Sequence, residues 1–116
     1  MICVFCQIIN DQAPAEVVQV WPDAIAIAPL QPVADGHRLV LPRTHVETAV
    51  TDPVVTATAA RRAAQTVRPG EHMALNVGPE AGQTVPHLHI HLWPCLGAGA
   101  CMPWGCPTTH RKGDSR

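Results

Sequence analysis

The sequence predicts an α+β domain in which an antiparallel five-stranded sheet carries one main helix and a short N-terminal helix. Five short segments rich in Val, Ile, Leu or Ala are separated by turn residues, in a chain with 12 Pro and 8 Gly. One longer segment repeats its apolar residues at helical spacing instead. A single helix packed on a sheet buries the apolar surfaces of both.

The first half of the chain contains the short helix and three strands. Residues Phe5–Ile9 favour a short turn of helix. Strands are predicted at Val17–Trp21 and Ala24–Ala28, and the turn Pro22-Asp23 joins them into a hairpin. The third strand is expected at Arg38–Leu41, because a proline follows it.

The main helix is predicted to begin at Asp52-Pro53, with Asp52 as the cap and Pro53 at the first helical position. It should continue to about Val67 and end before Pro69-Gly70. Its apolar stripe consists of Val55, Ala59, Ala60, Ala63, Ala64 and Val67. This stripe is the face expected to pack on the sheet.

The last two strands are predicted at Met73–Val77 and His87–Trp93, separated by the loop Gly78–Thr84. Alternate side chains of a strand share one face, so the three histidines of the last strand would form a row. The apolar residues between them would enter the core. Such a row suits a site that needs a nucleophile, a proton donor and a ligand. The alternative is an edge strand whose solvent-facing side carries histidines.

Length and charge limit the function. A chain of 116 residues fits one domain with one modest core. The 8 Lys and Arg nearly balance 9 Asp and Glu, so no extended nucleic-acid surface is expected, and a small anionic ligand fits better. No apolar run is long enough for a membrane span, and the five cysteines suit a reducing compartment. A cytoplasmic protein is therefore expected.

The loop before the last strand has the composition of a phosphate site. Backbone N–H groups made accessible by Gly82, together with the Thr84 hydroxyl, can surround phosphate oxygens. The neutral amide of Asn76 can bond a sugar or a phosphate. The alternative is a plain glycine turn, which the neighbouring histidines make the less favoured interpretation.

Several motifs resemble those of the histidine triad family. The run His87–Trp93, preceded by Asn76 and by Ala81–Val85, is similar to the family signature of three alternate histidines behind an Asn and an Ala-Gly-Gln-Ser/Thr-Val loop. Cys3–Cys6 resembles the family's opening Cys-x-Phe-Cys, and Gly36–His45 resembles its central Gly-His-x-Leu-Val-x-Pro-x-x-His strand. The resemblance covers most of the chain and also implies the α+β fold.

The resemblance implies a nucleotide site. The family's middle histidine is the nucleophile, a role carried over here to His89, and its third histidine, here His91, contacts the phosphate and manages protons. Nucleotide or phosphate binding is expected at Asn76, Gly82, Gln83, Thr84, His89 and His91. A backbone carbonyl bonded to one nitrogen of His89 would leave the other nitrogen for attack. His37 is either a partner of this row or a core histidine.

A structural Zn²⁺ is the expected cofactor. The spacing Cys3-x-x-Cys6 lets two thiolates bind one tetrahedral ion, which then needs two more ligands. The resemblance implies that His45 and His87 complete the site. The alternative is a pair of buried cysteines that serve as small apolar residues.

The C-terminal part offers two weaker features. Residues 1–96 are expected to form the histidine triad domain and residues 97–116 a partly flexible tail. A loosely spaced set in the tail region could form a rival metal site: Cys95, Cys101, Cys106 and His110. Trp104 resembles a family tryptophan that closes over the site, in some cases from a partner subunit.

The sequence departs from the family pattern at the nucleoside site. Pro29 replaces the usual Asp that holds the ribose hydroxyls, and Asp35 lies on the wrong side of the turn. Cys95 also stands where an Arg is common. The sequence leaves the base and the leaving group undefined.

Two main functions remain open, beside a weaker third, a metal-handling protein that uses both cysteine clusters. The first is a homodimeric hydrolase or nucleotidyl transferase that acts on nucleotide phosphoramidates or conjugates through a covalent nucleotidyl-histidine. The second is a noncatalytic, zinc-stabilised nucleotide-binding or interaction protein. The expected partner in both is a nucleotide or another phosphate-bearing small molecule, with no membrane involved.

Overall fold

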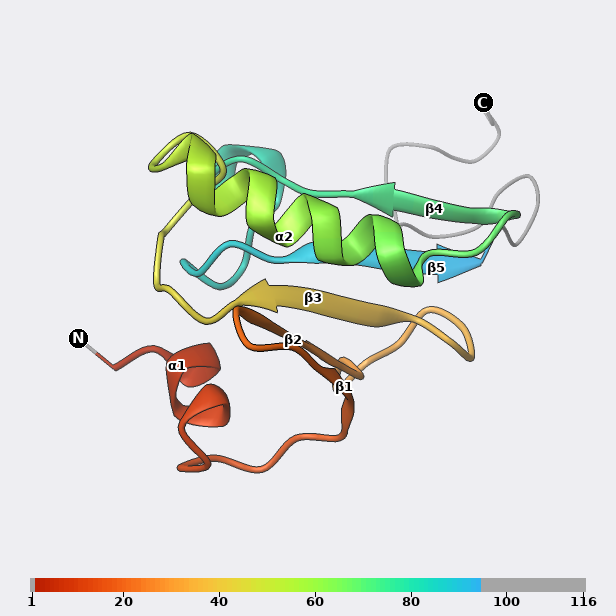
Figure 1. The fold of residues 1–116 in the computed structure, drawn as a ribbon, viewed down its shortest axis with the longest axis horizontal. Coiled ribbons are helices and arrows are strands. Elements are labelled where there is room, and N and C mark those ends of the chain that lie inside the picture. Colours follow the sequence, from red (N-terminus) through yellow and green to blue (C-terminus); the bar gives the residue numbers. More distant parts are fainter. Residues whose placement is uncertain (1, 95–116) are drawn as a thin grey trace.

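A computed structural model gives the structure of the chain and describes residues 2–94. Its five strands form one sheet in the order β1-β2-β3-β5-β4, with every neighbouring pair antiparallel. The strands are Val17–Val20 (β1), Ala24–Ile27 (β2), Arg38–Pro42 (β3), Glu71–Ala74 (β4) and Ile90–Pro94 (β5). The helices are Val4–Ile9 (α1), Pro53–Thr66 (α2) and the short 3₁₀ turn Pro79–Ala81 (η1). This arrangement confirms the predicted fold class (Figure 1).

The sequence predicted the first residue of both helices to within one residue. The carboxylate of Asp52 accepts the N–H of Val54 at 3.0 Å, and Pro53 begins α2 as predicted. The chain then turns at Gly70, whose φ of +91° favours glycine. Helix α1 begins at Val4, one residue before the prediction, with Cys3 at the capping position.

Strand β4 lies earlier than predicted, at Glu71–Ala74 and not at Met73–Val77. Its first two residues, Glu71 and His72, are polar, so the pattern of apolar residues does not indicate where the strand begins. Glu71 enters the sheet because its carboxylate pairs with Arg38 on β3 at 2.8 Å, and both side chains are only 7% exposed. A buried ion pair thus starts a strand that hydrophobic patterning alone misses.

Strand β5 is shorter than the predicted His87–Trp93, because it begins only at Ile90. Its pairing with β3 follows the register Val40↔Ile90 and Leu39↔His91. Continuing that register would bring Leu88 opposite Pro42, which has no N–H to donate. Ladder pairing therefore stops, and Leu88 instead donates its N–H to the carbonyl of Val46 at 2.8 Å. The first three predicted strands differ from the observed ones by one residue at an end.

The core lies on both faces of the sheet. Between the sheet and α2 it consists of Trp21, Ala24, Ala26, Val40, Val46, Ala59, Ala63, Leu88, Ile90 and Leu92. On the opposite face, Phe5 of α1 packs with Ile25, Ile27, Leu39 and Leu41. Figure 1 shows α2 crossing the sheet and α1 near the end of β3. The histidine row lies on the α1 side, because the residues between its members belong to the α2 side.

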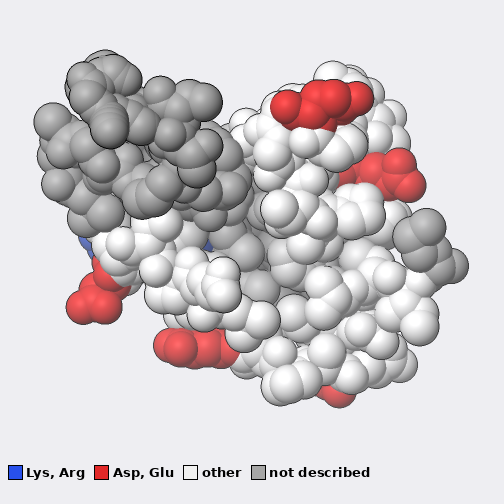
Figure 2. Space-filling model, turned by 180° about the vertical axis from the view of Figure 1, so that it is seen from behind, with Lys and Arg blue, Asp and Glu red and all other residues white. Residues whose placement is uncertain are grey.

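One face of the molecule shows few basic groups. Figure 2, seen from behind the view of Figure 1, shows acidic side chains at separate places and hardly any Lys or Arg among the described residues. Within residues 2–94, neither the length nor the apolar content of any helix is sufficient to cross a membrane.

Candidate active site and metal centre

The histidine row is anchored by the apolar residues between its members. Leu88, Ile90 and Leu92 are each no more than 1% exposed and belong to the core under α2. His87, His89 and His91 are also buried, on the other side of the segment. The predicted alternation therefore holds, although only His91 lies within β5.

The imidazole of His89 is fixed by the backbone. Its Nδ1 lies 2.8 Å from the carbonyl oxygen of His87, and because a carbonyl only accepts, Nδ1 carries the proton. The neutral ring therefore presents its lone pair at Nε2. Burial lowers the pKa of His89, against a raising effect of that carbonyl bond, so the ring stays neutral near pH 7. Phe5 contacts the ring edge to face at a centroid distance of 5.2 Å.

His87 is fixed with the opposite ring orientation. Its Nε2 lies 2.8 Å from the carbonyl oxygen of Pro42, so Nε2 donates and Nδ1 keeps a lone pair. The side chain is fully buried, and burial is the main cause that lowers the pKa of His87. His87 thus offers its Nδ1 as a ligand atom and its backbone carbonyl oxygen as the acceptor for His89.

Three ligand atoms from distant parts of the chain surround a fourth, Nδ1 of His87. Sγ of Cys3 lies 3.5 Å from it, Sγ of Cys6 3.6 Å, and Nδ1 of His45 3.1 Å. All four ligand atoms lie within 4.8 Å of one another, which is a cluster that could hold a metal ion. Two sulfur and two nitrogen donors match a tetrahedral structural site.

The cluster is partly open to solvent. His45 is exposed and both cysteines are half-buried, whereas His87 is not exposed at all. Burial, with Cys3 beside it, raises the pKa of the Cys6 thiol. A bound cation would reverse this by favouring the thiolate.

His37 contacts His91 directly. Its Nε2 lies 3.3 Å from Nδ1 of His91, and the two rings are 4% and 7% exposed. The N–H of Val33 donates to Nδ1 of His37 at 3.2 Å. His37 therefore combines both sequence interpretations: it is a buried histidine with a backbone partner, and it contacts the histidine row.

The loop before the row holds its shape through side chains. Gln83 accepts the N–H of Gly78 at 2.9 Å and donates to the carbonyls of Glu47 and Val85. Gly82 has a φ of +95°, and its N–H donates to Pro79. Gln83 thus has both amide hydrogens engaged, so the structure gives it a part in holding the loop.

Two polar groups of this loop remain for a ligand. The amide nitrogen of Asn76 donates to the carbonyl of Ala81 at 2.6 Å, whereas its Oδ1 is buried with no hydrogen-bond partner within residues 2–94. Thr84 is exposed. Asn76 follows Leu75, which packs against the core under α2.

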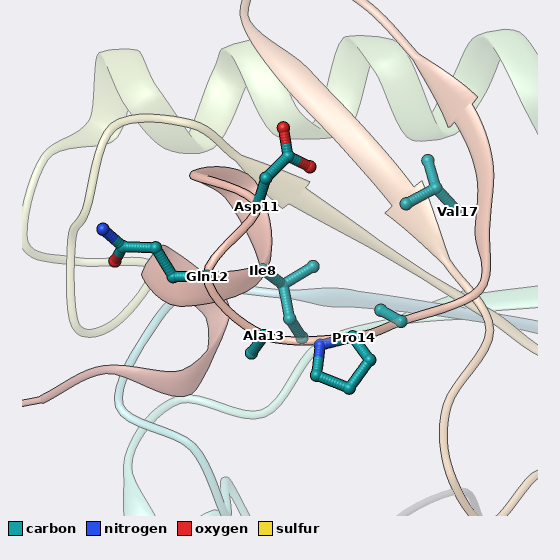
Figure 3. Close-up of a pocket in the computed structure, with 7 residues that line it drawn as sticks. Ile8, Asp11, Gln12, Ala13, Pro14 and Val17 are labelled. Carbon is teal, nitrogen blue, oxygen red and sulfur yellow. The ribbon is translucent and has the colours of Figure 1, made fainter.

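A separate pocket of about 360 Å³ lies between the end of α1 and β1 (Figure 3). Its lining residues are Ile8, Asp11, Gln12, Ala13, Pro14, Ala15 and Val17. None of them is a predicted site residue, and the lining brings only one ionisable side chain, Asp11. The converging histidines and cysteines, not this pocket, form the candidate site.

Two contacts of the site had little or no signal in the sequence. Phe5 packs edge to face on both His87 and His89, and only its place between the two cysteines of Cys-x-Phe-Cys hinted at this. The carbonyl of Pro42 is a backbone atom, which no side-chain pattern reveals. The predicted tail features, Trp104 and the set Cys95, Cys101, Cys106 and His110, lie outside the described residues.

Comparison with known proteins agrees with the geometry. The HIT domain model matches residues 10–95. An uncharacterized HIT-like protein of Mycobacterium tuberculosis is 37% identical over 105 residues, which are 81% of this chain and 72% of that protein. An adenylylsulfatase of Arabidopsis thaliana is 30% identical over 116 residues, covering 86% of this chain and 58% of that protein.

Among solved structures, a Zn-bound histidine triad family protein from Mycobacterium smegmatis superposes with a TM-score of 0.79. It is 31% identical, and the match covers 87% of this chain and 81% of that one. The family match spans most of the chain, and the histidine row, its lead-in loop, α2 and all five strands fall within the matched region. The chain therefore belongs to the histidine triad (HIT) family.

Proposed function

We propose that the protein is a hydrolase or nucleotidyl transferase that cleaves nucleotide phosphoramidates or related nucleotide conjugates. His89 is the proposed nucleophile, and a covalent nucleotidyl-histidine is the proposed intermediate. The observation that carries the proposal is the 2.8 Å bond from Nδ1 of His89 to the carbonyl of His87. That bond leaves the Nε2 lone pair as the reactive atom of a neutral, buried imidazole.

The proposed reaction has two displacements at phosphorus. Nε2 of His89 forms a bond to the α-phosphorus while the bond to the leaving amine breaks and the amine takes up a proton. Water then attacks the same phosphorus, the P–N bond to His89 breaks, and the nucleoside monophosphate leaves. Another acceptor in place of water would make the reaction a nucleotidyl transfer.

The surrounding groups suit a phosphate. Thr84 and the backbone around Gly82 lie in the loop that leads into the row, where neutral N–H and O–H donors can stabilise phosphate oxygens. The buried Oδ1 of Asn76 can accept a hydrogen bond from a donor on the substrate. His91 is the proposed phosphate contact beside His89, with ring centroids 5.1 Å apart.

Zinc is the proposed ion for the cluster of Cys3, Cys6, His45 and His87. Two thiolates with two imidazoles are a common zinc set, and a closed four-ligand site is structural. When bound, the ion supplies a rigid link between α1, the segment after β3 and the histidine row. The Zn-bound relative from Mycobacterium smegmatis supports this assignment.

The test of the function is turnover of an adenosine 5′-phosphoramidate by the zinc-loaded full chain. We expect release of the amine, and quenching in alkaline denaturant, in which a P–N bond to imidazole is stable, should trap a labelled adenylyl group on His89. The His89→Ala variant is the control for both readouts. No turnover and no adduct, with nucleotide binding intact, would favour the noncatalytic nucleotide-binding alternative.

Pro29 is the observation that favours this alternative, because it follows β2 where the resemblance places a ribose-binding carboxylate. Proline offers no side-chain hydrogen bond to a sugar. We expect the Kd values of a ribonucleotide and of its 2′-deoxyribonucleotide to differ by less than about threefold, which is under 1 kcal/mol. Pro29→Asp should raise the preference for the ribonucleotide, and a strong preference in the unmodified protein would contradict this interpretation.

A further inference from the structure

His37 and His91 form a directed chain of hydrogen bonds that starts at the backbone. The N–H of Val33 can only donate, so Nδ1 of His37 must accept, at 3.2 Å. In a neutral His37, the single ring proton then lies on Nε2. That atom is 3.3 Å from Nδ1 of His91 and donates to it.

The direction of this chain fixes the second ring. Nδ1 of His91 accepts from His37, so the proton of a neutral His91 lies on Nε2. His37 is 4% exposed and His91 is 7% exposed, so little water competes for these bonds. Burial lowers the pKa of His37. Burial first, then the nearby His89 and His37, lowers the pKa of His91 to about 3, so both rings are neutral near pH 7.

We propose that His37 is a positioning residue that selects the Nε2–H tautomer of His91. Resting on the proposed function, this assignment makes His91 a neutral hydrogen-bond donor toward the phosphoryl group. The opposite tautomer would turn a lone pair toward anionic oxygens and repel them. His37 itself touches neither the substrate nor His89 in this scheme; it acts through His91.

The hydrogen-bond partners of His89 and His91 give these two rings opposite tautomers. His89 carries its proton on Nδ1 because the carbonyl of His87 accepts there. His91 carries its proton on Nε2 because His37 donates to its other nitrogen. One ring then presents a lone pair for attack and the next presents a donor, which are the two functions that displacement at phosphorus requires.

The first test needs neither substrate nor a variant. In full-length, zinc-loaded protein labelled with ¹⁵N-histidine, the ring nitrogen shifts report the tautomer of each imidazole. We expect Nε2–H for His91 and Nδ1–H for His89 at neutral pH. An Nδ1–H tautomer for His91 would overturn the proposal, whether or not the protein turns over a phosphoramidate.

Two variants of His37 separate positioning from packing. His37→Gln keeps an amide donor near the place of Nε2, whereas His37→Leu removes the donor. We expect His91 to keep the Nε2–H tautomer in His37→Gln and to become a mixture in His37→Leu. His72→Leu is the matched control, because His72 is exposed and stacks on Trp93 at a centroid distance of 4.9 Å.

Kinetics complete the test if phosphoramidate turnover is established. His37→Leu should lower kcat about 10- to 100-fold with KM changed less than about threefold, and His37→Gln should recover most of the loss. Unchanged kcat and an unchanged His91 tautomer in His37→Leu would overturn the assignment. If His37→Leu does not fold, the wild-type tautomer and His37→Gln decide the question.

Discussion

In each imidazole of the histidine row, one ring nitrogen has a hydrogen-bond partner that sets whether this nitrogen carries the proton. The protonation of that nitrogen decides whether the other one can donate or accept. His87 is held at Nε2 by Pro42, and His89 at Nδ1 by His87. His87 therefore faces the cysteines with a lone pair, whereas His89 keeps a lone pair at its opposite nitrogen. Identical residue types two positions apart acquire different chemistry from different backbone acceptors.

The first residue-scale prediction concerns His89 and His87. His89→Ala should abolish the covalent adduct and lower turnover by on the order of 10³-fold or more, with metal content unchanged. His87→Ala should lose metal and stability first, because it removes a ligand. Turnover and metal content are measured for both variants. Metal loss in His89→Ala, or near-normal turnover, would show that the roles are assigned in the wrong order.

The second residue-scale prediction concerns the metal. Cys3→Ala removes one of four ligands, so bound zinc and thermal stability should fall together, with Tm lower by about 4–8 °C for each kcal/mol lost. Atomic absorption and thermal unfolding are the measurements. Cys95→Ala is the matched cysteine control. Equal zinc in Cys3→Ala and wild type contradicts the site, and zinc loss in Cys95→Ala would point to the tail.

At the scale of elements, a buried ion pair ties β3, β4 and the end of α2 together. Arg38 donates to both carboxylate oxygens of Glu71, at 2.9 and 2.8 Å, and to the carbonyl of Thr66 at 2.7 Å. The guanidinium thus satisfies a carbonyl of the last helical turn while it neutralises a buried carboxylate. Strand β5 lies between β3 and β4, so this link holds the strand that carries His91.

This ion pair predicts how stability depends on pH. The hydrogen bonds from Arg38, against the cost of burial, lower the pKa of Glu71 from 4.5 to about 2. The folded-state pKa is depressed, so the stabilisation is complete above the unfolded pKa and is lost as pH falls from about 4.5 to about 2. Denaturant unfolding across that range measures the loss.

Glu71→Gln is the variant for this prediction. It leaves Arg38 buried without its counter-charge and should cost on the order of 3 kcal/mol at pH 7. It should also show a weaker loss of stability in acid than wild type. Asp23→Asn is the matched control, because Asp23 pairs with Arg62 at 2.8 Å with its side chain 41% exposed. A larger destabilisation in Asp23→Asn than in Glu71→Gln contradicts the argument.

At the scale of the whole molecule, the two faces of the sheet have different roles. The face under α2 holds the larger core, and the other face holds the histidine row and α1. Loops at the end of β3 and before β5 bring the metal cluster and the row together. Because His87 belongs to both, unfolding of α1 would disturb the candidate active site as well as the metal cluster.

The prediction at this scale is a homodimer, motivated by the small core and by the family resemblance. Sedimentation at micromolar concentration should give about twice the 12.4 kDa of one chain. Trp104→Ala tests whether the tail completes a partner's site: it should then lower turnover without dissociating the dimer. A single-chain species at that concentration excludes the dimer and with it any role for Trp104 across an interface.

The sequence alone was sufficient wherever the information is local. Asp52-Pro53 begins α2, Leu88, Ile90 and Leu92 alternate with histidines, and the spacing of Cys3 and Cys6 suits a shared ion. Capping, alternation and short spacings depend on residues within a few positions of one another, so they can be read directly from the chain. The ligand set itself came from the family resemblance.

Tertiary structure decided what depends on contacts between distant residues. Glu71 became the start of β4 only because Arg38 neutralises it, and β5 is shortened by the proline opposite Leu88. The contact of His37 with His91 joins positions 54 residues apart. Register, burial and backbone acceptors set these features, and they also set which nitrogen of each histidine is left to react, because a ring proton goes to whichever atom faces an acceptor.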